Sequence, residues 1–107
     1  MTIDTTGGIF VTKKEKALKK WKESIQPLTP RQDVETMGRR YGFRIENLPG
    51  SHMRFFHDAL KGEEGFTDLG FVEIPSVGGQ KVKKEYIKNL IKAIEIIENE
   101  EGNDEKE

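Results

Sequence analysis

Both histidines of the chain, His52 and His57, stand in the short stretch LPGSHMRFFH. An imidazole has an ordinary pKa of about 6.5, so histidine is the side chain best suited to exchange protons near neutral pH. Ser51 directly precedes His52, but neighbouring side chains of an extended segment point to opposite sides. This pair therefore cannot form the hydrogen bond between a serine nucleophile and its base, and we exclude a serine hydrolase.

The spacing of the two histidines excludes two further kinds of site. Five residues along a strand span about 16 Å, so His52 and His57 are too far apart to share a metal ion or to work as an acid–base pair. The chain has no cysteine, so thiolate metal ligands and thiol nucleophiles are also excluded. We expect neither a metal nor a cofactor.

A lone imidazole beside a cation suits the cleavage of RNA. The 2′-hydroxyl of the substrate is the nucleophile there, so the protein needs only to move protons and to stabilise charge. Arg54 falls on the same side of the predicted strand as His52. Glu46 or Glu73, on neighbouring strands, could orient the ring or serve as a second proton carrier. The alternative interpretation is an ordinary surface histidine at the start of a strand.

Alternation of apolar and polar residues predicts the sheet that must hold these side chains. FRIENL and HMRFFH form a hairpin around the turn signal Pro49–Gly50, and LGFVEIP forms a third strand that Pro75 ends. One face of so small a sheet must lie under helices. The residues predicted on that covered face are Phe43, Ile45, Met53, Phe55, Val72 and Ile74. The residues predicted on the opposite, open face are Arg44, Glu46, His52, Arg54, Phe56, Phe71 and Glu73.

Apolar residues at helical spacing predict three helices. The first, at residues 13–25, is amphipathic and rich in lysine, and the third carries a broad apolar face between Val82 and Ile97. The second has capping signals: Thr29 as N-cap, Pro30 at the first position, Gln32 completing a capping box, and Gly42 at the end. The predicted class is therefore α+β, in the order α-α-β-β-β-α, with a three-stranded antiparallel sheet and the helices on one of its faces.

Three lysines, Lys81, Lys83 and Lys84, are predicted at the start of the last helix. Each cation there opposes the helix dipole by about 0.3–1 kcal/mol, which favours an anion such as a backbone phosphate at this position. The adjacent Gly78–Gly79 pair would let the backbone approach it closely. The alternative is a basic helix start that faces water. With Arg44 and Arg54, these lysines form the predicted RNA-binding set.

Composition indicates one small domain at residues 13–97, between a flexible lead at residues 1–12 and a disordered acidic tail at residues 98–107. The tail holds six acidic residues and one lysine, a charge of −5, which leaves +4 on residues 1–97 of a chain whose net charge is −1. No apolar run approaches the ~18 residues of a membrane span, and the first residues, MTIDTTGGIFV, lack the basic start and the apolar stretch that are typical of a signal peptide. We expect a cytoplasmic protein without a membrane partner.

The segments GFRIENLPGSHMRFFH and VEIPSVGGQKVKKEYIKNLIKAI resemble the HicA family, small toxins of bacterial and archaeal toxin–antitoxin pairs. The matching positions are Gly42, Phe43, Gly50, Ser51, His52, Ile74, Pro75, Gly79 and Val82. The resemblance covers about residues 30–97. It implies a fold like that of double-stranded-RNA-binding domains, metal-independent cleavage of mRNA with His52 as general acid–base, and a HicB-like antitoxin as partner. The alternatives are a non-catalytic RNA-binding module of the same fold and a protein-interaction domain.

Overall fold

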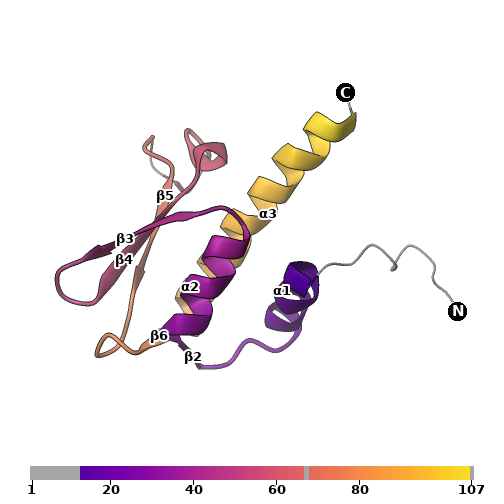
Figure 1. The fold of residues 1–107 in the computed structure, drawn as a ribbon. Helices are drawn as coiled ribbons and strands as arrows, with labels where there is room; N and C mark the ends of the chain where they lie inside the picture. The colour runs from indigo at the N-terminus through magenta and orange to yellow at the C-terminus, as the bar shows by residue number, and fades with distance from the viewer. Residues whose placement is uncertain (1–12, 67, 107) are drawn as a thin grey trace, which may run out of the picture.

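A computed structural model of the chain describes residues 13–66 and 68–106 (Figure 1). The elements are α1 (Lys13–Glu23), β2 (Leu28–Pro30), α2 (Arg31–Arg40), β3 (Arg44–Leu48), β4 (His52–Phe56), η2 (Asp58–Leu60), β5 (Phe71–Pro75), β6 (Lys81–Lys83) and α3 (Lys84–Lys106). The predicted α+β class and the three-stranded antiparallel sheet are confirmed. The predicted lead at residues 1–12 lies outside the described residues.

Strand β4 is the middle strand of the larger sheet, whose order is β3-β4-β5 with both pairs antiparallel. Leu48 of β3 and Pro75 of β5 both pair with His52, at the start of β4. The turn between β3 and β4 has Gly50 at φ 81° and Ser51 at φ 76°. This left-handed backbone is easy for glycine and uncommon for serine. The register then sends alternate residues of each strand to opposite faces.

Helices α2 and α3 pack against one face of this sheet, and α1 contacts α2 (Figure 1). The predicted covered face is correct, because Phe43, Met53, Phe55, Val72 and Ile74 are buried and Ile45 packs partly buried against them. Gly38 of α2 lies directly over the ring of Phe55, where a Cβ atom would collide with the ring. The absence of a side chain at this glycine therefore allows α2 to approach the sheet closely.

A second, two-stranded sheet joins β2 to β6 and was not predicted. Thr29 pairs with Val82 in this sheet and is buried, so it is not the N-cap of α2. The N-cap is Pro30, without a side-chain hydrogen bond, and the predicted capping box with Gln32 is wrong. Instead, the backbone N–H of Arg31 donates to the carbonyl of Gln80 at 2.8 Å. Pairing with a distant strand has thus replaced the local cap.

Strand β6 shows that two of the three lysines predicted at the start of the last helix lie on a strand instead. Lys81 and Lys83 lie on β6 with exposed side chains on either side of the buried Val82, and only Lys84 begins α3. The helix-dipole argument therefore applies to Lys84 alone.

Helix α3 also continues to Lys106, through residues for which a disordered tail is predicted. Glutamate favours helices, and extending an existing helix needs no new nucleus.

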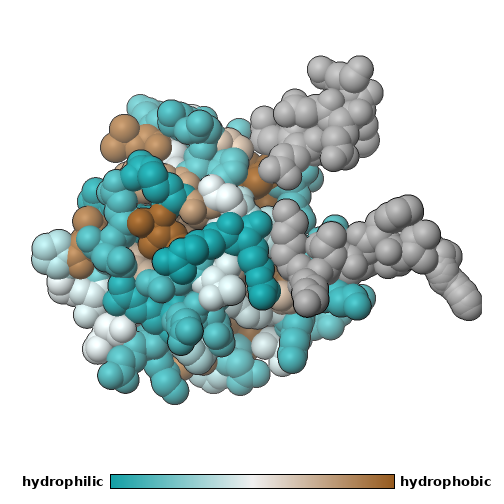
Figure 2. All heavy atoms as spheres, in the orientation of Figure 1, coloured by the Kyte–Doolittle hydropathy of each residue, from teal (hydrophilic) through white to brown (hydrophobic). Residues whose placement is uncertain are grey.

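The surface on the side of the molecule shown in Figure 2 is mostly hydrophilic, with small and separate hydrophobic patches. This agrees with a chain in which 35% of the residues are charged. In the described part of the chain, no helix combines the length and the apolar character that crossing a bilayer requires.

Candidate active site

His52, Arg54 and Glu73 meet on the open face of the sheet. Glu73 lies on β5 opposite Arg54 and diagonal to His52, so its carboxylate reaches both neighbours on β4. One carboxylate oxygen lies 2.9 Å from Nδ1 of His52, and the other lies 3.7 Å from Nε of Arg54. The first distance is a hydrogen bond, whereas the second is an ion pair only. The side chain of His52 remains 43% exposed, so a substrate can reach it.

This arrangement fixes the role of the two ring nitrogens of His52. A carboxylate at Nδ1 accepts a hydrogen bond from the protonated nitrogen, which selects the tautomer with the proton on Nδ1. Nε2 is then the nitrogen that carries a lone pair and can take a proton from a substrate. Glu73 also stabilises the imidazolium that forms after the proton has moved. Of the two carboxylates predicted to orient the ring, the structure places Glu73 there.

Glu46 has a different partner. It forms an ion pair with Arg44, two residues away on β3. Glu46 pairs across the sheet with Arg54 on β4, and Arg54 pairs on its other side with Glu73 on β5. Glu46 thus contributes to a row of alternating charges across the three strands, and its carboxylate pairs with Arg44 rather than with the imidazole of His52.

Aromatic rings and guanidinium groups form the next row of the open face. Arg44, Phe56 and Phe71 stand opposite one another on β3, β4 and β5. The guanidinium of Arg44 lies 4.3 Å from the centre of the Phe56 ring, and that of Arg54 lies 4.8 Å from the centre of the Phe71 ring. The two rings are themselves 5.1 Å apart. Such cation–π pairs hold flat side chains in place on the same open face as the imidazole of His52, toward its other end.

The turn in front of His52 is held by the loop that follows β5. The carbonyl oxygen of Ser51 accepts two hydrogen bonds from Ser76, one from its backbone N–H and one from its hydroxyl, each at 2.8 Å. Two bonds to one carbonyl compensate for the uncommon left-handed backbone of Ser51, whose cost is of order 1–3 kcal/mol. The start of β4, and with it His52, is therefore fixed relative to the end of β5.

Arg31, at the start of α2, contacts the segments around the β3–β4 turn from the covered side of the sheet. Its guanidinium donates to the side-chain oxygen of Asn47 on β3 and, at 3.4 Å, to the carbonyl of Gly79. Glu35 holds the guanidinium through a 3.2 Å ion pair one helical turn along α2. Sequence reasoning missed Arg31 and Ser76, because both act through contacts between distant segments and no local pattern marks them.

The segment that carries the lysines lies beside this turn. Gly79 is close to Ser51, since a Cβ atom built on the glycine would lie 3.4 Å from the serine hydroxyl. Lys81 follows two residues later and pairs with Val77. Lys81 and Lys83 thus extend from the end of the sheet at which His52 lies, while Arg44 stands at the opposite end of the open face.

His57 has a structural role of its own. Its Nδ1 accepts a hydrogen bond from the backbone N–H of Ala59 at 3.0 Å, so it caps the short helix η2. Its ring also packs edge-on against Phe43 at 5.7 Å. His52, at the other end of β4, has Glu73 as its partner. Within the described residues, no three histidine, aspartate or glutamate side chains gather as a metal-binding group.

The arrangement can therefore perform proton transfer at Nε2 of an oriented imidazole, with arginines nearby to attract an anion. Comparison of the chain with protein families, with curated proteins and with solved structures finds no match. The geometry of the open face is consequently the basis for a functional proposal.

Proposed function

We propose that this protein is a HicA-like toxin, an endonuclease that cleaves mRNA without a metal ion. The observation that carries the proposal is the 2.9 Å contact between Nδ1 of His52 and the carboxylate of Glu73 on an open, arginine-bearing sheet face. The order of motifs around His52, in which the family resemblance lies, supports the same proposal. The finer fold assignment, like that of double-stranded-RNA-binding domains, belongs to it as well.

In the proposed reaction, Nε2 of His52 takes the proton from a 2′-hydroxyl of the RNA. The 2′-oxygen then forms a bond to the adjacent phosphorus, and the bond from phosphorus to the 5′-oxygen breaks. The products are a 2′,3′-cyclic phosphate and a 5′-hydroxyl, whose proton comes from the imidazolium or from water. Glu73 holds the ring and stabilises its charge, and Arg54 attracts the phosphate.

The flanking cations would hold the rest of the RNA backbone. Arg44 lies on the open face, and Lys81, Lys83 and Lys84 lie on β6 and at the start of α3. These groups need no particular base, because phosphate contacts position a nucleic acid without reading its sequence. A non-catalytic RNA-binding module would use the same cations and would not require His52, so a variant at His52 distinguishes the two functions.

A HicB-like antitoxin is the proposed protein partner. Phe56 and Phe71, half-buried beside two arginines, mix apolar and cationic groups on one exposed surface. Protein interfaces enrich aromatic residues and arginine in the same way. An acidic antitoxin surface over this face would cover His52 and stop cleavage.

The test of the proposal is the variant His52→Ala. RNA cleavage in the presence of a chelator, with the products resolved on a gel, should be about 10²–10⁴-fold slower than with the unchanged protein. The exposed position of His52 should keep the loss of stability well below the ~2 kcal/mol of a core truncation. RNA binding should persist, because the cations remain.

The matched control is Asn89→Ala, which changes an exposed polar residue of α3. Purified by the same steps, this variant should cleave RNA at the unchanged rate. Loss of cleavage in the His52 variant alone would then exclude a contaminating nuclease, which would be present in both preparations. Normal cleavage by the His52 variant would refute the catalytic assignment and would favour the RNA-binding module.

A further inference from the structure

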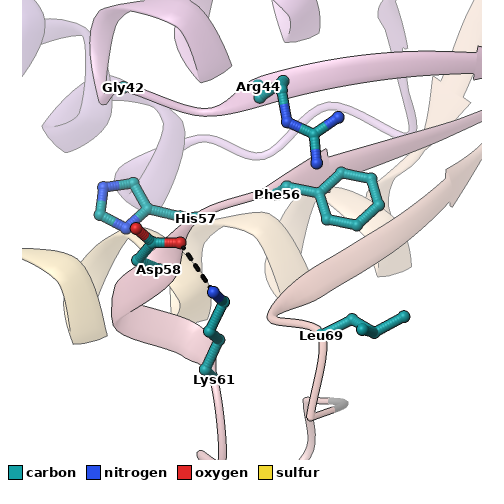
Figure 3. A pocket seen from close by; sticks show the side chains of 7 residues that line it. All are labelled: Gly42, Arg44, Phe56, His57, Asp58, Lys61 and Leu69. Atoms are coloured by element: carbon teal, nitrogen blue, oxygen red, sulfur yellow. Dashed lines mark ion pairs between the residues drawn. The ribbon is translucent and has the colours of Figure 1, made fainter.

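A pocket of about 480 Å³ lies at the end of the open face that is farthest from His52 along β4 (Figure 3). Arg44 and Phe56 line it, and both also belong to the open face. Its other walls come from the turn after α2, from η2 and the residues that flank it, and from the segment in front of β5. The pocket is therefore a continuation of the surface that carries His52. It has the size of a small-molecule site, for which about 300–1,000 Å³ is usual.

The pocket offers a flat aromatic ring with a cation beside it. The ring of Phe56 is held between the guanidinium of Arg44, 4.3 Å away, and the ring of Phe71, 5.1 Å away. Proteins that bind single-stranded nucleic acids combine aromatic side chains, on which bases stack, with positive groups that follow the backbone. Phe56 and Arg44 provide this combination.

Polar groups complete the opposite wall. Lys61 and Asp58 form an ion pair at 3.2 Å, and Figure 3 shows both side chains on the same side of the pocket. Because Nδ1 of His57 accepts a hydrogen bond from Ala59, the neutral ring carries its hydrogen on Nε2 and can donate it. The edge of a base presents both donors and acceptors, and this wall presents the complementary groups.

We propose that this pocket binds one nucleotide of single-stranded RNA, with its base against the guanidinium of Arg44 and the Phe56 ring beside it and with its phosphate near Lys61. The inference rests on the proposed function, because it adds a second binding position to the same RNA strand. From His52 to Phe56, four residues of β4 span about 13 Å. An RNA strand that follows β4 from the scissile phosphate would reach the pocket a few nucleotides away.

The charges of the pocket favour a nucleotide over a protein segment. Arg44 and Lys61 are cationic and Asp58 is the one acidic residue among the lining side chains, so the lining carries a net charge of +1. Arg44 also pairs with Glu46 outside the lining, and Lys61 pairs with Asp58. Leu69, which is 65% exposed, lies at the rim and provides an apolar contact beside the base. The pocket would thus select the RNA strand by a nucleotide at a fixed distance from the cleaved bond.

The first test is a titration of the full chain with each nucleoside 5′-monophosphate, followed by the amide signals in NMR spectra. Signals of the pocket residues should shift, and Phe56→Ala should weaken binding roughly 5- to 100-fold. Lys61→Gln should weaken it less. The matched controls Val77→Ala and Lys88→Gln change an exposed apolar residue and an exposed lysine outside the pocket, and should leave the affinity unchanged.

Ribose 5-phosphate is the control for the ligand. It lacks the base, so it should bind more weakly than every nucleotide, and its binding should not depend on Phe56. Equal binding of ribose 5-phosphate and the nucleotides would show a phosphate site only and would overturn the proposal. The absence of shifts in the pocket would also overturn it and would leave this surface to a protein partner.

The second test uses RNA oligonucleotides in which one nucleotide lacks its base. Moving this gap along the strand should reduce cleavage at one fixed distance from the scissile bond and should have little effect elsewhere. Cleavage that depends on His52 but tolerates the gap at every position would refute the pocket and keep the nuclease. Nucleotide binding in the pocket without any RNA cleavage would keep the pocket and refute the nuclease, so the two failures are distinguishable.

Discussion

The two faces of the β3-β4-β5 sheet are built from the same strands and differ in almost every other respect. On the covered face, Met53, Phe55 and Ile74 are fully buried under α2 and α3. On the open face, the neighbours of these residues along the chain are His52, Arg54 and Glu73, which interact with one another beside solvent. The alternation of each strand thus places a buried, stabilising residue beside one that the proposed function assigns to the active site.

This difference separates stability from chemistry within a single strand. Substitutions on the covered face should act on the free energy of unfolding, because they change packing that excludes water. Substitutions on the open face should act on proton transfer and on RNA binding, because their side chains contribute little to the core. A variant that lowers the free energy of unfolding and the rate of RNA cleavage to the same degree would show that the two faces are coupled.

The largest expected effect on stability is at Phe55. Phe55→Ala removes a ring that is packed against Phe43 and Gly38, and should cost about 3–5 kcal/mol of unfolding free energy. The matched variant Phe56→Ala removes the next ring along β4, which is only half-buried, and should cost about 1 kcal/mol. Urea denaturation measures both, and equal losses would contradict the division between the faces.

The buried Tyr41 makes the free energy of unfolding depend on pH in the alkaline range. Burial, followed by the nearby carboxylates of Glu98 and Glu15, raises the pKa of Tyr41 to about 12 from its ordinary value near 10. Between these pH values the unfolded tyrosine loses its proton and the folded one keeps it, so stability falls as pH rises. The stabilisation is complete below about pH 10, and about 2 kcal/mol should be lost by pH 12.

The variant Tyr41→Phe tests this alkaline loss, because phenylalanine has no proton to release. Its unfolding free energy should decline less between pH 10 and pH 12 than that of the unchanged protein, whatever the two values are at pH 7. Parallel declines would show that other groups, such as the lysines, cause the alkaline loss.

On the open face, Glu73→Gln tests how the imidazole is held. The amide oxygen can still accept a hydrogen bond from Nδ1 of His52, but the negative charge that stabilises the imidazolium is absent. We expect RNA cleavage to slow by about tenfold, which corresponds to about 1.4 kcal/mol in the barrier. Glu46→Gln is the matched control, because its carboxylate pairs with Arg44 instead. An equal effect of the two variants would show a general role of charge rather than orientation of His52.

The smallest expected effect is at the lysines. Changing Lys81, Lys83 and Lys84 together to glutamine should weaken RNA binding and flatten its salt dependence by roughly 0.7–0.9 logarithmic units per lost phosphate contact. Folding should be unaffected, because all three side chains are exposed. Affinity measured at several salt concentrations decides this, and an unchanged slope would remove the lysines from the RNA site.

The larger sheet could be predicted from the sequence because its signals are local. The alternation in FRIENL and HMRFFH fixed which residues share a face, and Pro75 marked the end of β5. The site residues followed from this alternation, which placed His52, Arg54 and both candidate carboxylates together. The choice between Glu46 and Glu73 could not be made, since both stand opposite Arg54 and diagonal to His52. It depends on the side-chain partners in the folded sheet, which are Arg44 for Glu46 and His52 for Glu73.

The errors share one physical cause. Thr29 and Pro30 have the composition of a helix start, and Lys81 to Lys83 directly precede a strongly helical segment, so local propensity favoured helix at both places. Each segment is instead a strand, because it pairs with the other across about fifty residues of chain. Contacts over such separations override the local preference for helix. A strand of three residues is also too short to show a periodic pattern in the sequence.

The pairing of β2 with β6 also bears on the order in which the molecule assembles. Strands β3, β4 and β5 follow one another along the chain, with residues 49–51 between the first two and residues 57–70 between the last two. Both connections are much shorter than the separation of β2 from β6, so the larger sheet can form early. Strand β2 precedes this three-stranded sheet in the chain and β6 follows it. The two strands can therefore pair only when the chain segments before and after the sheet have come together. Because α2 begins directly after β2 and α3 directly after β6, this pairing joins the first turns of both helices. We therefore expect the last step of folding, and the first local opening of the native state, to be the joint release of these two helix starts.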